Sequence, residues 1–67
     1  MEKYEATAEW DGTWWVVTVH DVPVNGPTVT QGHSRTDAED MTVDMMATML
    51  GHRDFLVTVH FKEKSDG

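Results

Sequence analysis

Hydrophobic and polar side chains alternate along residues 3–10, a pattern typical of a strand that buries one face. The pair Asp11-Gly12 follows, and Asp-Gly is favoured in two-residue type I′ turns. We therefore predict a hairpin in which residues 13–20 form the second strand and Ala8 lies opposite Trp15. Both strands then agree on which face is apolar. That face collects Tyr4, Ala6, Ala8, Trp15, Val17 and Val19.

The second strand contains two consecutive tryptophans, and neighbouring residues of a strand point to opposite faces. Trp15 has the parity of the apolar face, so we expect it in the core, under a helix and against Met41 or Met45. Trp14 then lies on the other face of the sheet, beside Glu9.

From Ser34 onward the hydrophobic period changes to that of a helix. Ser34 and Asp37 have the spacing of an N-cap followed by an acid three residues later, and Gly51 is a natural C′ residue. Apolar residues recur every three or four positions between them and predict a stripe that packs on a sheet. The stripe comprises Ala38, Met41, Met45 and Met49, widened by Val43, Met46, Ala47 and Leu50.

Two further strands are predicted, at residues 28–32 and 54–62. The predicted fold is α+β with the order β-β-β-α-β in one domain over residues 1–67, ordered over about 3–62, with a polar tail at 63–67. We expect one mostly antiparallel sheet of strand order 3-2-1-4, in which strands one and four are parallel. The single helix covers one face of this sheet and leaves the other face open.

The chain of 67 residues has twelve acidic and five basic residues, for a formal net charge of −7. This balance argues against binding nucleic acid or an anionic membrane surface, and it suits a basic partner. Solubility alone is the other interpretation of the charge. There is no cysteine and no apolar run long enough to span a membrane, so we expect a cytoplasmic protein.

Two stretches of the sequence, WDGTWWVVTVHDVP and TVTQGHSRTDAEDM, resemble the HicB-like antitoxins of bacterial toxin–antitoxin systems. The resemblance covers about residues 3–61. It rests on the order and spacing of Asp11, Gly12, Trp14, Trp15, Val17, Val19, Asp21, Pro23, Thr30, Gln31, Gly32, Ser34, Asp37 and Ala38.

The resemblance implies a partial ribonuclease-H-like fold and the binding of a small basic HicA-like toxin that cuts mRNA. Two departures are His20, where the family usually has proline, and the additional residues 25–27. Longer family members add a DNA-binding domain that this sequence does not contain, so we expect no direct DNA binding by this chain alone.

Candidate partner-binding residues fall on two surfaces. On the open face they are Glu9, Trp14, Val16 and Leu56, and on the helix they are Asp37, Asp40 and Asp44. Tryptophan is enriched at binding hot spots, and the open face also invites a homodimer. The other interpretations are that Trp14 simply covers the sheet and that the acidic row is a solvated helix face.

Catalysis is not expected. No acidic side chain has the parity of the core face, and Glu5 and Glu9 have no third acidic partner for a two-metal site. His20 and His60 would approach each other on the open face, where two histidines and a carboxylate can bind zinc, but two solvated strand histidines is the favoured interpretation. We expect no enzyme activity, metal or cofactor.

Two further function classes stay open. An acidic phage-type inhibitor could imitate nucleic acid, as anti-CRISPR proteins do, and would need acids along one continuous stripe. An orphan structural or regulatory dimer would need no toxin. A small basic reading frame beside the gene would favour the antitoxin.

Overall fold

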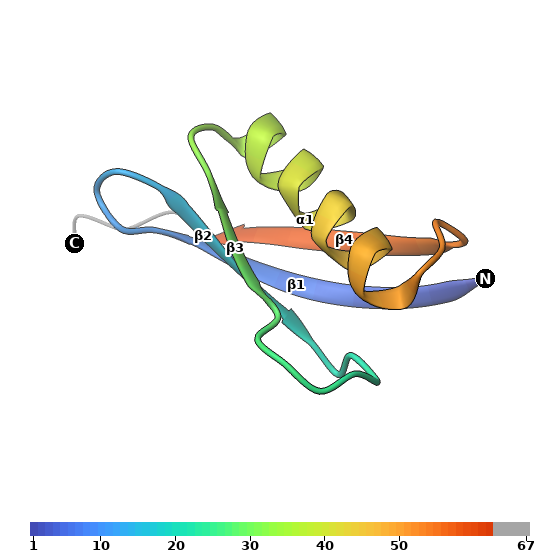
Figure 1. Ribbon diagram of the computed structural model, residues 1–67. Coiled ribbons are helices and arrows are strands. Elements are labelled where there is room, and N and C mark those ends of the chain that lie inside the picture. Colours follow the sequence, from blue (N-terminus) through green and yellow to red (C-terminus); the bar gives the residue numbers. More distant parts are fainter. Residues whose placement is uncertain (63–67) are drawn as a thin grey trace.

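Four strands form a single sheet, and one helix packs across one of its faces (Figure 1). The computed structural model describes residues 1–62, so the predicted polar tail at 63–67 lies outside the described residues. The elements are β1 (Glu2–Trp10), β2 (Trp15–His20), β3 (Val29–Gly32), α1 (Arg35–Leu50) and β4 (Phe55–Lys62).

The strand order is β3-β2-β1-β4, which confirms the predicted β-β-β-α-β topology. β1 pairs with β2 and β2 with β3 in antiparallel fashion, whereas β1 and β4 are parallel, so the sheet is mixed. The parallel pair is possible because α1 carries the chain from β3, at one edge, back to β4 at the other.

The register of the first hairpin differs from the prediction. Trp10 pairs with Trp15 and Ala8 with Val17, so residues 11–14 form the loop and the predicted two-residue turn is wrong. A type I′ turn needs positive φ at both central residues, and here Gly12 has a φ of 104° whereas Asp11 is not in that region. The pairing moves by two residues, so the alternation of faces along β1 and β2 is kept, but Thr13 and Trp14 lie in the loop instead of in the sheet.

The hairpin loop is closed by Asp11. Its Oδ1 accepts hydrogen bonds from the backbone N–H groups of Thr13 at 2.9 Å and Trp14 at 2.7 Å. The Asp11 N–H in turn donates to the Trp14 carbonyl at 3.0 Å. Aspartate side chains favour such local bonds to the following backbone, and this explains why the wider loop replaces the tight turn.

The core lies between α1 and the sheet and consists of Ala6, Ala8, Val17, Val19, Ala38, Met46 and Phe55. Ala38, Thr42 and Met46 form the fully buried line of α1, and the Thr42 hydroxyl donates to the Ala38 carbonyl at 2.7 Å. Met41 is 42% exposed, so its predicted place in the core is wrong. The buried residues of α1 are four positions apart, starting at Ala38. Met41 falls outside this row, so its side chain lies at the flank of the stripe.

Both ends of α1 are as predicted. The Ser34 side chain accepts from the Asp37 N–H at 3.1 Å, and Gly51 ends the helix with a φ of 79°. At the start of α1 the backbone passes very close to β3, since a Cβ on Gly32 would lie 2.4 Å from the Ala38 nitrogen. Glycine at position 32 therefore sets how closely the helix approaches the sheet.

Candidate functional site

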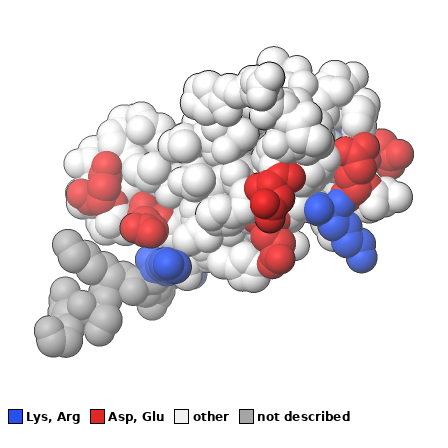
Figure 2. Space-filling model, turned by 90° about the horizontal axis from the view of Figure 1, so that it is seen from below, with Lys and Arg blue, Asp and Glu red and all other residues white. Residues whose placement is uncertain are grey.

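The sheet face opposite α1 is the candidate binding surface, and we call it the open face. β1, β2 and β4 contribute alternate residues to it, which are Lys3, Glu5, Thr7, Glu9, Val16, Thr18, His20, Leu56, Thr58, His60 and Lys62. Figure 2 shows this side of the molecule, with acidic side chains in separate groups and basic side chains beside some of them. The acids on this side do not form the continuous stripe that a nucleic-acid mimic would need.

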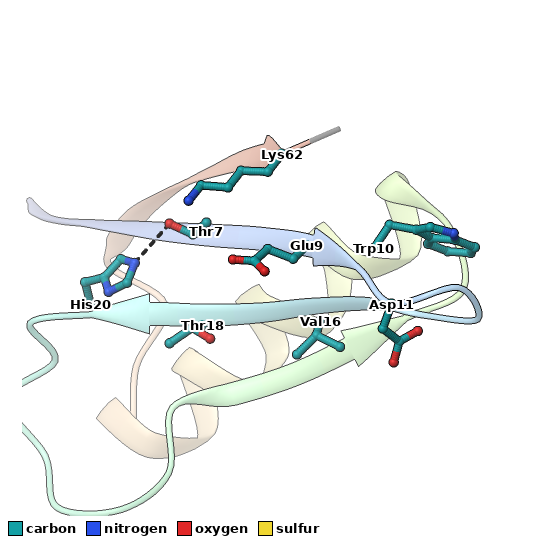
Figure 3. A pocket seen from close by; sticks show the side chains of 8 residues that line it. All are labelled: Thr7, Glu9, Trp10, Asp11, Val16, Thr18, His20 and Lys62. Atoms are coloured by element: carbon teal, nitrogen blue, oxygen red, sulfur yellow. Dashed lines mark hydrogen bonds between the residues drawn. The ribbon is translucent and has the colours of Figure 1, made fainter. Parts of the chain in front are cut away.

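A surface hollow of about 470 Å³ lies on the open face (Figure 3). Thr7, Glu9, Val16 and Thr18 from β1 and β2 lie across it, with His20 at one end and Trp10 and Asp11 at the other. Lys62 reaches the hollow from β4, where it pairs with Glu9. The hollow therefore combines one aliphatic residue and an indole with hydroxyls and both signs of charge.

The two histidines of the open face have different partners. His20 Nε2 lies 3.0 Å from the Thr7 hydroxyl, and His60 Nε2 lies 2.9 Å from Glu5 Oε1. Across residues 1–62 no group of three histidine, aspartate or glutamate side chains is arranged to hold a metal ion. Each histidine therefore contacts a side chain of β1, His20 from β2 and His60 from β4.

Trp14 does not lie beside Glu9, because the shifted register pairs Glu9 with Val16. Trp14 is half-buried in the hairpin loop, where its ring centroid is 4.0 Å from that of His33. Trp10, whose even number gives it the parity of the helix side in β1, is the tryptophan that borders the hollow. Trp10 is the last residue of β1 and is 37% exposed, so its indole can border the hollow.

The predicted open-face residues are only partly brought together. Glu9 and Val16 are paired neighbours in the hollow. Leu56 is 51% exposed on the same face, but it pairs with Lys3 at the far end of β1. The residues of the hollow that were not among the predicted partner-binding residues are Thr7, Trp10, Asp11, Thr18, His20 and Lys62. The predicted parallel pairing of strands one and four was the signal that could have placed Lys62 beside Glu9.

The helix acids lie on the opposite side of the molecule from the hollow, because α1 covers the other face of the sheet (Figure 1). Asp37 serves the helix start, where its Oδ2 accepts from the His33 N–H at 2.9 Å. Asp44 lies 3.5 Å from the Arg53 guanidinium in an exposed ion pair. Asp40 is exposed.

Two ionisable side chains have shifted pKa values, the Asp11 carboxyl at the rim of the hollow and the Tyr4 phenol. Hydrogen bonds from the Trp14 and Thr13 N–H groups hold the pKa of Asp11 below its ordinary value of 3.8. The hydrogen bond that the Tyr4 hydroxyl donates to Glu2 raises the pKa of the phenol above 10.0. Asp11 therefore stays charged at the rim of the hollow well into acidic solution.

Comparison of the chain with protein-family models, with curated proteins and with solved structures gave no significant match. Within the described part of the chain, no helix has the length and apolar character needed to cross a membrane. The case for a function therefore rests on the fold, the open face and the charge.

Proposed function

We propose that this chain is a HicB-like antitoxin, a protein-binding module that captures and neutralises a small basic mRNA-cleaving toxin. The observation that carries the proposal is the sheet order β3-β2-β1-β4 with one helix on one face. It agrees with the fold implied by the resemblance of residues 3–61 to that family.

The hollow on the open face is the proposed toxin-binding surface. Trp10 offers a large, partly exposed indole, and tryptophan is among the residue types enriched at binding hot spots. Val16 gives the floor an apolar element, while Glu9 and Asp11 offer carboxylates to a lysine or arginine. Such a mixture of apolar centre and charged rim is typical of protein interfaces.

The charge of the whole chain supports a basic partner. A net charge of −7 attracts a cationic protein at long range and speeds its association, mainly at low ionic strength. Binding alone would suffice, because a toxin that cuts mRNA is blocked when its RNA-binding surface is covered. We therefore propose a cytoplasmic inhibitor that uses no catalysis and no cofactor.

The test is to purify the chain with the small basic protein encoded beside its gene and to measure binding by calorimetry. We expect co-expression to rescue growth from that protein, and Glu9→Lys to weaken binding about tenfold or more, the order expected when a carboxylate paired across an interface is reversed. The matched control is Glu39→Lys, which makes the same charge change at an exposed position on α1. Failure of the chain to bind any neighbouring basic protein would end the antitoxin proposal.

A further inference from the structure

β4 is an unusually open edge of the sheet. It spans eight residues, Phe55–Lys62, pairs with β1 on one side, and within residues 1–62 has no strand on its other side. It contains no proline or glycine, its pairing with β1 is continuous without a bulge, and its lysine is the last residue. Proteins usually protect edge strands with such features, so an edge without them is a template for another strand.

The helix-facing side of β4 is incompletely covered. Ala6 and Ala8 of the neighbouring β1 are 0% exposed, whereas their partners in β4, Val59 and Phe61, remain only half-buried. The backbone of α1 lies nearer to β3, the strand that precedes it at the opposite edge of the sheet, than to β4. An apolar margin therefore runs along β4, beside the unpaired backbone.

The sequence of this edge is complementary to itself. When two copies of residues 54–62 are placed antiparallel about a two-fold axis at Thr58, three of the five kinds of pair are of like residues and one sets an acid against a base. From the axis outward the pairs are Thr58 with Thr58, Val57 with Val59, Leu56 with His60, Phe55 with Phe61, and Asp54 with Lys62.

Three of these five pairs are of kinds that stabilise an antiparallel ladder. Threonine pairs, aromatic pairs and opposite charges directly across from each other are the favourable combinations. Odd-numbered residues meet odd-numbered residues, so the apolar margins of the two copies join on the helix side of one continuous sheet.

Other registers match less well. Moving the axis to Val59 would set Lys62 against Leu56, would set Thr58 against His60, and would lose the pairing of Phe55 with Phe61. An axis between Thr58 and Val59 would place these two residues opposite each other and would turn the apolar margins to opposite faces.

We infer that the β4 edge is the interface for a second copy of this chain, which pairs β4 with β4 about Thr58 to give an eight-stranded sheet. Both helices then lie on one side, and the hollow on the open face stays uncovered. This inference is independent of the toxin, and it differs from the sequence-based expectation that the open face itself forms the dimer.

The first test is the mass of the purified full chain by light scattering and sedimentation equilibrium over a range of concentrations. We expect twice the chain mass of 7.6 kDa, and Thr58→Lys should raise the dissociation constant about tenfold or more by setting two lysines opposite each other. The new lysine lies beside Glu5 in the same subunit, so the monomer should still fold. Circular dichroism checks this.

The matched control is Thr18→Lys, the same substitution on the same face but on β2, away from the edge. It should leave the dimer unchanged. Dissociation by Thr18→Lys with retention by Thr58→Lys would place the interface on the open face and overturn the inference. A mass of 7.6 kDa at every concentration would also overturn it.

A charge exchange tests the register. Asp54→Lys and Lys62→Asp should each weaken the dimer, because each sets like charges opposite each other. The double variant restores opposite charges across the axis without changing the net charge, and it should recover dimerisation beyond either single variant. A double variant no better than the weaker single one would exclude pairing about Thr58.

Discussion

Trp14 and Trp15 are adjacent in the chain but have different surroundings. Trp15 packs edge-on against Phe61 at a centroid distance of 5.0 Å and lies 5.5 Å from Trp10. The Arg35 guanidinium carbon is 5.4 Å from the centre of the Trp15 ring. Trp14 contacts the ring of His33 in the loop region. One indole therefore joins β1, β2, β4 and the start of α1, and the other joins two loops.

Truncating these residues should separate the two environments. Trp15→Ala should cost about 3–5 kcal/mol of unfolding free energy, as for other packed tryptophans, which is comparable with the whole stability of so small a domain. Trp14→Ala should cost about 1 kcal/mol, the size of a typical substitution. Thermal melts followed by circular dichroism measure both, and equal losses would show that Trp14 is as much a core residue as Trp15.

At the scale of residues, the sequence predicted well on which face of the sheet a strand residue lies, but it predicted poorly which side chains that residue contacts. The alternation of apolar and polar positions assigned Trp15 to the helix side correctly, because side-chain parity is a local property. Its partners Phe61 and Arg35 come from two other elements, so no local pattern contained them. Met41 was misplaced because a broad apolar stripe does not show which of its rows is central.

At the scale of elements, the β1–β2 hairpin shows how a side chain can set a loop. Asp-Gly favours a two-residue turn, but the Asp11 carboxylate binds two following N–H groups and the loop takes four residues. The preference of Asp-Gly for a tight turn therefore gave the wrong register for the β1–β2 pair. The helix caps at Ser34 and Gly51 were predicted correctly, because each depends on one local interaction.

The Asp11 bonds make the hairpin sensitive to acid. The folded pKa of Asp11 is lowered, so its stabilising effect is complete above the ordinary pKa of 3.8 and is lost as the pH falls through the folded value. Asp11→Asn keeps an acceptor oxygen but cannot titrate, so its melting temperature should fall less than that of the wild type on acidification. If the melting temperatures of the two proteins fell in parallel as the pH was lowered well below 3.8, this role for Asp11 would be contradicted.

At the scale of the whole molecule, the strand order was predictable because few topologies connect three strands, a helix and a fourth strand compactly. The hollow could not be predicted, because it depends on the hairpin register and on the pairing of Glu9 with Lys62, which is distant in the sequence. The acids of α1 and those of the open face are on opposite sides, so a single rigid partner cannot contact both groups at once.

The overall charge gives a prediction about nucleic acid. DNA is a dense polyanion, and a chain with a net charge of −7 gains nothing from releasing its counterions. The isolated chain should show no sequence-specific band shift with its own promoter DNA at any salt concentration. A specific shift that resists added salt would mean that shape or base contacts outweigh the repulsion.

The parallel pairing of β1 with β4 has a consequence for how the chain folds. Every pair in this ladder joins residues more than fifty positions apart, from Glu2 with Phe55 to Glu9 with Lys62. Closing so long a loop costs entropy before any contact repays it, and chains rich in distant contacts fold slowly. During synthesis on a ribosome, β1 is made before the other strands, and it cannot pair with β4 until residues 55–62 have been made. The central strand of the finished sheet is thus an exposed edge during synthesis, and that interval is when this small protein is most open to pairing with the wrong strand.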